Sequence, residues 1–168
     1  ARPTHEYLGY SAGLDFETKI IVKENAPELL RDELSRPGWT PQPIGMSGVT
    51  DPYQPIERKL QLTRKCLEVF AEFRNPVGVI TKNDLVTRDI DILADLARYN
   101  AVSVRLSITS LDKKLADRME PRAARPAQRL RAIEMLASAG IRVGVMVAPV
   151  VPGLNDHEIS GILRAAAD

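Results

Sequence analysis

Side chains that can bind a charged ligand follow three short apolar runs of this 168-residue chain. Ser47, Thr50 and Asp51 follow the first run, Lys82 follows the second, and Ser107 lies near the end of the third. A lysine ammonium can pair with a carboxylate or a phosphate, and hydroxyl groups both donate and accept hydrogen bonds. Each residue taken alone is explained as well by helix capping, because Ser, Thr and Asp are common before helices. As a set they favour a site for a polar ligand with a carboxylate and a ribose.

The apolar runs alternate with stretches of helical spacing, and this order determines where the polar residues lie. Strands are predicted at residues 19–23, 44–47, 77–81, 102–108 and 143–147. Helices are predicted at 26–34 and 62–73, after Thr87, around 130–137 and after Asp156, with Asn25, Thr87 and Asp156 as caps. Strands that alternate with helices indicate βαβ units and a mostly parallel sheet. In such folds ligands bind where the strands end.

Two of the predicted strands have one apolar face and one small or polar face. In residues 102–108 the polar face carries Ser103, Arg105 and Ser107, and in residues 143–147 Gly144 and Met146 alternate with valines. A doubly wound sheet would be apolar on both faces, because helices cover both. The pattern therefore favours an α/β barrel or half-barrel with a ligand in its lumen.

Composition narrows the class of function. The chain has 23 basic and 22 acidic residues, so a globally basic nucleic-acid binder is not indicated. Residues 112–131 have a local net charge of +4, which suits an anionic substrate such as nucleic acid, although such runs are more often solvated helix faces. No apolar run reaches the roughly 20 residues of a membrane helix.

The single cysteine excludes an internal disulfide framework and a metal site built from this chain's cysteines. It makes a reducing, cytoplasmic compartment the expected location. Cys66 is predicted to be a buried structural residue, and His5 and His157 lack neighbours at metal-ligand spacing. No Walker lysine loop, GxGxxG or GxSxG occurs, which disfavours three common α/β enzyme classes.

Several segments together resemble one family. ARPTHEYLGYSAGLDFETKI resembles the sequence that follows the cluster-binding loop in radical S-adenosylmethionine (SAM) proteins of the spore photoproduct lyase-like, or DNA repair photolyase-like, group. SGVTDPYQPIE resembles that group's second-strand motif, and ITKN, RLSITS, MEPRAARPAQRLRAIEMLASAGI and VAPVVPGLND resemble later strand ends. The resemblance covers essentially the whole chain in the right order.

The resemblance implies a fold, a cofactor and roles for individual residues. The fold would be a partial, TIM-like (β/α)6 barrel, with residues 1–168 forming part of the core domain. SAM would bind at a [4Fe-4S] cluster held by a CxxxCxxC loop, and an electron donor would reduce that cluster so that SAM gives a 5′-deoxyadenosyl radical. Ser47, Gly48 and Thr50 would lie near the SAM amino and carboxylate groups. Lys82 and Ser107 would contact its carboxylate and ribose.

At the adenine, the same resemblance implies backbone contacts from Ala148. Asp51, Tyr53 and Glu57 belong to the second-strand motif, and the resemblance assigns no individual role to them, although Asp51 is included among the predicted cofactor-binding residues.

The chain departs from the family because it lacks the three cluster cysteines. It begins at Ala1 rather than Met and ends within a predicted helix, so we expect a fragment, truncated at both ends, that by itself holds no cluster and has no radical activity.

Three hypotheses follow. The first is a radical SAM enzyme, including a lyase that acts on a nucleic-acid lesion. The second is a non-catalytic partial barrel that binds a nucleotide-like ligand or a partner protein. The third is an ordinary (β/α)8 enzyme that uses Asp51 or Lys82 as an acid or base. Upstream cysteines distinguish the first hypothesis from the second.

Overall fold

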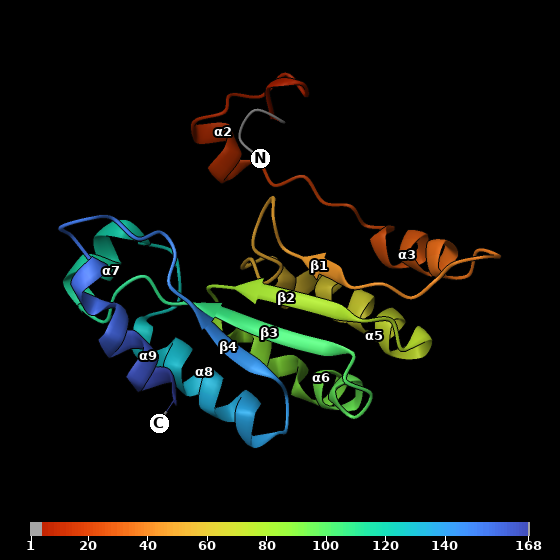
Figure 1. Ribbon diagram of the computed structural model, residues 1–168. Coiled ribbons are helices and arrows are strands. Elements are labelled where there is room, and N and C mark those ends of the chain that lie inside the picture. The colour runs from red at the N-terminus through yellow and green to blue at the C-terminus, as the bar shows by residue number, and fades with distance from the viewer. Residues whose placement is uncertain (1–4, 168) are drawn as a thin grey trace.

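The chain forms a four-stranded parallel sheet with helices packed on one side of it (Figure 1). The computed structural model describes residues 5–167. The strands are β1 (Ile44–Met46), β2 (Val77–Thr81), β3 (Val102–Ser107) and β4 (Val143–Met146), and they lie in the order of the sequence. Each neighbouring pair is parallel. This confirms the predicted α/β class and the arrangement of a partial barrel.

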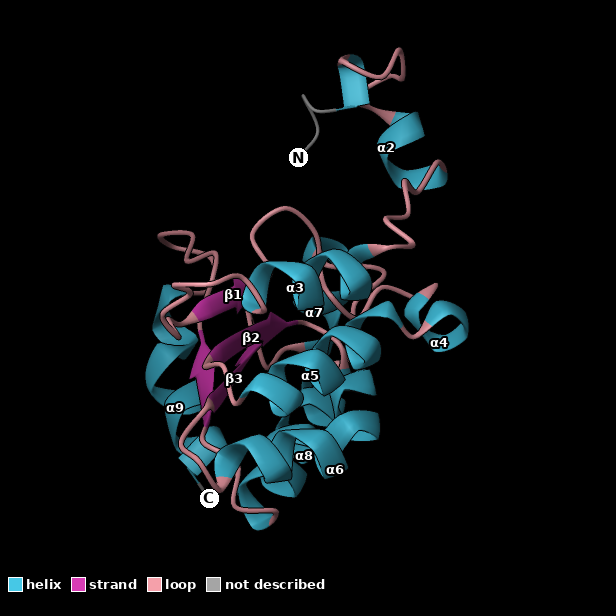
Figure 2. Cartoon of the chain, turned by 90° about the vertical axis from the view of Figure 1, so that its right-hand side faces the viewer, coloured by secondary structure: helices cyan, strands magenta, loops and turns pink. Residues whose placement is uncertain are grey.

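Most helices connect consecutive strands, as expected of βαβ units. The longer helices are α3 (Ala26–Leu34), α5 (Leu62–Phe73), α6 (Ile90–Ala97), α8 (Pro126–Ser138) and α9 (Ile159–Ala167). Short helices are α2 (Leu14–Thr18), α4 (Glu57–Leu60) and α7 (Lys113–Met119), and 3-10 turns occur at Asp84–Asp89 and Asp156–Glu158. Viewed from the side, α5, α6 and α8 form a layer against one face of the sheet (Figure 2).

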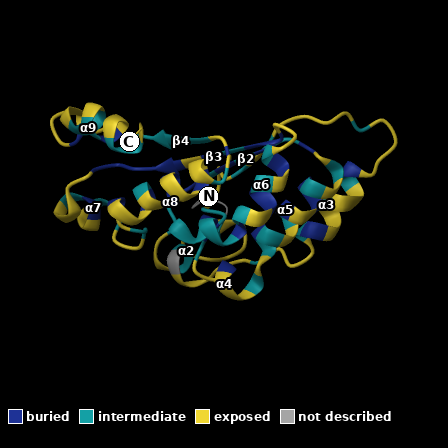
Figure 3. Cartoon of the chain, turned by 90° about the horizontal axis from the view of Figure 1, so that it is seen from below, coloured by how far each residue is buried: buried dark blue, intermediate teal, exposed yellow. Residues whose placement is uncertain are grey.

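The core lies between this helix layer and the sheet. Val79, Val104 and Leu106 are completely buried on the helix side, together with Leu67 of α5 and Leu93 of α6. Figure 3 shows the same division, with buried positions on the inner sides of the helices and exposed positions outside. Truncating such a leucine to alanine typically costs about 2 to 5 kcal/mol. The buried apolar side chains thus determine which face of the sheet packs against the helices.

The opposite face of the sheet is small or polar, as the alternation predicts. The register places Gly45 of β1 beside Gly78 of β2, and Gly78 beside Ser103 of β3. One step along, Arg105 lies beside Gly144 and is exposed. Ile80 and Met146 are the larger apolar residues on this face, near the strand ends, and the glycines, Ser103 and Arg105 elsewhere on it offer helices little apolar area to cover.

The predicted strand at residues 19–23 is wrong. The segment is irregular, and Ile20 and Ile21 are 46% and 48% exposed. It lines a pocket beside β1 instead of joining the sheet. A β-branched run becomes a strand only where a neighbouring strand edge accepts its backbone hydrogen bonds, and the sequence of the run does not supply that edge.

The predicted helix caps also need correction. Asn25 stands at the start of α3 without a capping hydrogen bond from its side chain. Asn83, rather than Thr87, caps the 3-10 turn before α6 by accepting from the Leu85 N–H at 3.0 Å. Asp156 lies inside the 3-10 turn before α9. Short polar side chains accept from whichever free N–H lies nearest, and the inserted 3-10 turns change that position.

A buried ionic cluster joins the loop after β1 to the helix layer. Asp89 is completely buried and accepts from Arg88 Nη2 at 2.7 Å, Arg64 Nη1 at 3.0 Å and the Tyr53 hydroxyl at 3.1 Å. Glu57 accepts from Arg88 Nη2 at 2.9 Å. These contacts hold two residues of the 47–57 motif, Tyr53 and Glu57, against the start of α5 and the turn before α6.

We predict that Asp89→Ala lowers the free energy of unfolding by about 3 kcal/mol, because it leaves the hydroxyl of the buried Tyr53 without its acceptor and two partly buried arginines without a shared partner. Asp91→Ala is the matched control, since Asp91 also pairs with Arg64, at 2.8 Å, but its side chain is 61% exposed. The control should lose less than about 1 kcal/mol. Urea unfolding of both variants measures this, and equal losses would contradict the buried role.

Candidate functional site

A pocket of about 370 Å³ lies at the carboxyl ends of the strands and is called the strand-end pocket below. All seven cofactor-binding residues predicted from the sequence line it: Ser47, Gly48, Thr50, Asp51, Lys82, Ser107 and Ala148. They come from the ends of four strands that are separated along the chain. Parallel strands bring their carboxyl ends to one edge, which explains why residues so far apart meet there.

Asp51 fastens the loop after β1 to the end of β2. Its carboxylate accepts from the Thr81 hydroxyl at 2.6 Å, from the Lys82 backbone N–H at 2.7 Å and from the Tyr53 N–H at 2.9 Å. A carboxylate with these partners is occupied by structural contacts, which disfavours its use as a general acid or base. Gly48, with a φ of +96°, turns the same loop in a conformation that suits glycine.

Lys82 extends from the end of β2 toward the end of β4. Its ammonium donates to Glu120 Oε1 at 2.5 Å and to the Ala148 carbonyl at 3.2 Å. Its side chain is 36% exposed, so the ammonium is neither buried nor freely solvated. Ser107 is buried at the end of β3, and its carbonyl accepts from Arg129 Nη1 at 2.6 Å.

Tyr53 and Glu57, the other motif residues, support the loop without lining the strand-end pocket. Burial raises the pKa of the Tyr53 hydroxyl, and the nearby Asp89 carboxylate raises it further. Glu57 is buried and accepts from the Thr63 N–H at 3.0 Å as well as from Arg88. Both residues therefore have clear structural contacts.

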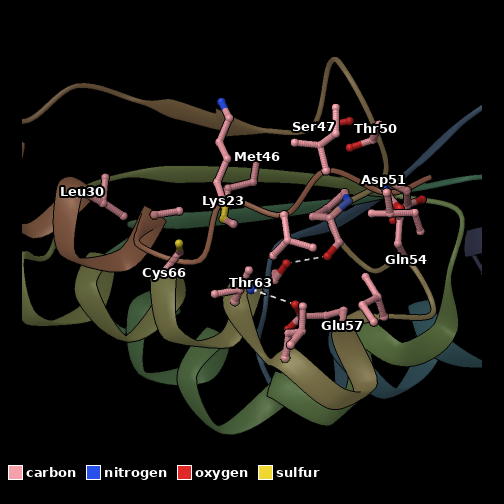
Figure 4. Close-up of a pocket in the computed structure, with 18 of the residues that line it drawn as sticks. Lys23, Leu30, Met46, Ser47, Thr50, Asp51, Gln54, Glu57, Thr63 and Cys66 are labelled. Atoms are coloured by element: carbon pink, nitrogen blue, oxygen red, sulfur yellow. Dashed lines mark hydrogen bonds between the residues drawn. The ribbon is translucent and has the colours of Figure 1, made fainter. Parts of the chain in front are cut away.

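A larger pocket of about 620 Å³ lies beside β1, between α3, α5 and residues 20–23 (Figure 4). Ser47, Thr50 and Asp51 line both this pocket and the strand-end pocket, so the two are neighbours. Cys66 faces it and is half-buried, which corrects the prediction of a buried cysteine. Burial raises the pKa of the Cys66 thiol to about 11, so the thiol stays protonated and unreactive at neutral pH.

A second strand-end cavity of about 550 Å³ adjoins the first and is called the outer pocket. Asp51 and Lys82 line both cavities. Phe16 and Met119 give the outer pocket apolar surface, and Glu120 contributes a carboxylate. Phe16, Met119 and Glu120 are not among the site residues predicted from the sequence.

The basic stretch at 112–131 is not a uniformly solvated face. Arg129 of α8 is 1% exposed and donates to Glu120 Oε2 at 2.7 Å. Thr109 donates to Glu120 Oε1 at 2.8 Å, so Glu120 and Thr109 also belong to the site. Helical spacing could have indicated the buried position of Arg129, because residues 129, 132, 133 and 136 share the buried side of α8. A charge at such a position needs a buried partner.

The comparison with protein families covers most of the chain. Residues 17–166 match the Radical SAM superfamily. This chain belongs to the radical SAM superfamily. All four strands of the parallel sheet lie within the matched residues.

Two similar proteins cover most of this chain but less than half of their own length. An uncharacterized protein of Mycobacterium tuberculosis is 38% identical over 156 residues, which are 93% of this chain and 46% of that protein. The radical SAM Nalpha-GlyT isomerase of Pseudomonas phage M6 is 28% identical over 140 residues, covering 83% of this chain and 28% of the isomerase. This radical SAM chain thus spans a little under half of its mycobacterial relative.

Among solved structures, spore photoproduct lyase complexed with dinucleoside spore photoproduct is similar with a TM-score of 0.55. The similarity covers 87% of this chain and 40% of the lyase chain, at 20% sequence identity. At that identity the comparison shows a shared fold.

Within residues 5–167, no group of three or more His, Cys, Asp or Glu side chains is arranged to hold a metal ion. The helices of the described part are also too short, or not apolar enough, to cross a bilayer.

Glu158, before α9, fastens the loop after β3 at the same rim. Its Oε1 accepts from the Ser110 hydroxyl at 2.6 Å, and its Oε2 accepts from the Leu111 N–H at 2.7 Å. Burial by itself raises the pKa of the Glu158 carboxyl, but these hydrogen bonds outweigh it, so the pKa lies below its ordinary value. A carboxyl whose pKa is lowered by folding stabilises the fold above its unfolded pKa, and this stabilisation is lost as pH falls.

We predict that Glu158→Gln lowers the free energy of unfolding at pH 7 by about 1 to 2 kcal/mol, the usual worth of such hydrogen bonds. The difference from the unsubstituted protein should shrink as pH falls below about 4, because protonation removes the same charge. Urea unfolding between pH 7 and pH 3 measures it, and a difference that is constant with pH would contradict the prediction.

Proposed function

We propose that this chain provides the SAM-binding part of a radical SAM enzyme. The observation that carries the proposal is the meeting of seven residues from four strand ends around one pocket of about 370 Å³. Superfamily membership supplies the ligand, and the residue types suit it. When bound to a reduced [4Fe-4S] cluster, SAM supplies the 5′-deoxyadenosyl radical with which such enzymes abstract a substrate hydrogen.

The proposed roles follow from the polar groups of each residue that are exposed at the pocket and can contact a ligand. Lys82 binds the SAM carboxylate, because its ammonium lies at the rim and is partly exposed. The hydroxyls of Ser47 and Thr50, both exposed on the loop after β1, bind the amino and carboxylate groups. Ser107 lies at the ribose and the Ala148 backbone at the adenine. Asp51 acts indirectly by holding the loop in place.

The cluster does not fit the side chains of this chain. A [4Fe-4S] cluster of this family needs three thiolates, and the chain has one cysteine, on α5, whose thiol is held protonated by burial. We therefore propose that a CxxxCxxC segment outside residues 1–168 supplies the cluster ligands. A cytoplasmic electron donor would be its redox partner.

For the substrate we propose a nucleic acid, with a lyase acting on a lesion as the first candidate reaction. Support comes from spore photoproduct lyase, whose structure holds a dinucleoside photoproduct and shares this fold. Lys113, Lys114 and Arg118 of α7 are exposed close to the outer pocket, which the end of α7 lines. Exposed cations of this kind can bind phosphates without base contacts.

The binding role of Lys82 gives a direct test. Lys82→Ala in the intact protein should weaken SAM binding about 10- to 100-fold, because a charge-assisted hydrogen bond is worth about 1.5 to 3 kcal/mol. Glu120 keeps Thr109 and Arg129 as partners, so the fold should persist. Calorimetry measures the affinity, and Lys59→Ala on α4 is the control. Unchanged affinity would refute the proposed contact between Lys82 and the SAM carboxylate. SAM binding by an intact protein that lacks a CxxxCxxC segment would instead favour the hypothesis of a non-catalytic barrel.

The nucleic-acid proposal is tested by salt dependence. Binding of a single-stranded oligonucleotide, followed by fluorescence anisotropy, should weaken with salt, with a logarithmic slope of about 0.7 per phosphate neutralised. Replacing Lys114 and Arg118 by glutamine should reduce that slope by up to about 1.4. Lys59 and Lys65, exposed on α4 and α5, are replaced in the control. Equal slopes for both double variants would contradict a contact at α7.

A further inference from the structure

The ammonium of Lys82 is held in place before any ligand arrives. Glu120 Oε1 at 2.5 Å and the Ala148 carbonyl at 3.2 Å accept two of its three N–H groups. Among residues 5–167 no third acceptor contacts it. A free lysine side chain samples many rotamers, and ordering it costs free energy that a ligand would otherwise have to supply.

Glu120 is in turn fixed by groups that cannot easily move. Arg129 donates to Glu120 Oε2 at 2.7 Å, and its own side chain is 2% exposed. Arg129 also donates to the carbonyls of Ser107 and Ala124, both at 2.6 Å. Arg129 therefore fixes the Glu120 carboxylate relative to the end of β3.

The protonation of Glu120 supports the same arrangement. Burial by itself raises the pKa of its carboxyl, but hydrogen bonds from Lys82, Thr109 and Arg129 outweigh burial and hold the pKa below the ordinary glutamate value. The carboxylate is thus charged throughout the neutral pH range. Lys82, Glu120 and Arg129 together carry a formal charge of +1, which one ligand carboxylate neutralises.

The two cavities show which side of the ammonium is left available. Lys82 lines both, whereas Glu120 lines the outer pocket and not the strand-end pocket. The carboxylate thus occupies the side of the ammonium that faces the outer pocket. Ala148, whose carbonyl accepts a second N–H, lines the strand-end pocket together with Lys82, and we infer that the third N–H serves a ligand there, where the proposed function places the SAM carboxylate.

We propose that Glu120 is a positioning residue that presents the Lys82 ammonium to a single carboxylate in the strand-end pocket. The proposal rests on the proposed function and adds to it a source of selectivity for the amino-acid part of the ligand. Glu120 acts through Lys82 and does not itself contact the ligand. Its length matters as well as its charge, because one carboxylate must reach Lys82 and Arg129 together.

The test compares the affinities of SAM and decarboxylated SAM, which differ only in the carboxylate. The dissociation constant of decarboxylated SAM divided by that of SAM is called the ratio below, and it measures the contribution of the carboxylate. A general loss of folded protein affects both constants equally and cancels from the ratio. Glu120→Asp keeps the charge and shortens the side chain, whereas Glu120→Gln keeps the length and removes the charge. Glu158→Asp, a carboxylate at the same rim that contacts Ser110 instead of Lys82, is the matched control. Binding is measured by calorimetry on the intact protein, with thermal unfolding alongside.

We expect the unsubstituted protein to favour SAM. Glu120→Asp should reduce the ratio by about 10-fold, which is within the free-energy cost of ordering a free lysine side chain. Glu158→Asp should leave the ratio unchanged. Glu120→Gln should reduce the ratio less, because its amide oxygen still accepts from Lys82. An unchanged ratio in Glu120→Asp, or equal losses for both ligands, would overturn the positioning role. A raised ratio in Glu120→Gln with no change in Glu120→Asp would also overturn it, showing that charge alone acts. An unsubstituted protein with no preference for SAM would instead overturn the proposed role of Lys82.

Discussion

The carboxylate of Asp51 determines how the first two strand ends meet, and the strand-end pocket depends on it. Three donors from two separate segments converge on this one side chain, at 2.6 to 2.9 Å. A loop such as 47–57, with one glycine and two prolines, has little regular structure to hold it. Hydrogen bonds to a charged acceptor are roughly twice as strong as neutral ones, so a single aspartate can replace that missing support.

The same principle recurs around the rim of the sheet. Asn155 is completely buried and donates to the carbonyls of Thr109 and Pro149, which ties the ends of β3 and β4 together. Lys82 and Glu120 then connect β2 with the segment after α7. Polar side chains, rather than apolar packing, therefore set the geometry where the strands end. This leaves the rim polar enough to receive a charged ligand.

Each buried charged side chain among residues 5–167 has a partner of opposite charge. Arg129 has Glu120, and Asp89 has two arginines. Removing a charge from water costs several kcal/mol, and only close, well-oriented partners repay it. Such pairs give at best a small net gain in stability. Their value here is positional, because each links segments that are distant in the sequence: Arg129 to the end of β3, and Asp89 to the 47–57 loop.

The sequence predicted the fold from local regularities. The alternation in residues 102–108 gave the face that contacts the helices, because side chains on a strand point alternately to the two sides. The order of strands and helices indicated a parallel sheet, and the parallel sheet placed the seven lining residues at one edge. The run at 19–23 shows the limit of such reasoning, because its isoleucines suit a strand but found no partner strand within the described residues.

What the sequence determined by itself was the class of fold, the four paired strands and the residues at their ends, since these depend on periodicities of two and 3.6 residues. Only the tertiary structure decided how those residues are connected. Lys82 and Glu120 are 38 positions apart, and Asp51 and Lys82 are 31 apart. No local pattern links residues at such separations, because the contact exists only after the helices bury one face of the sheet and bring the strand ends together.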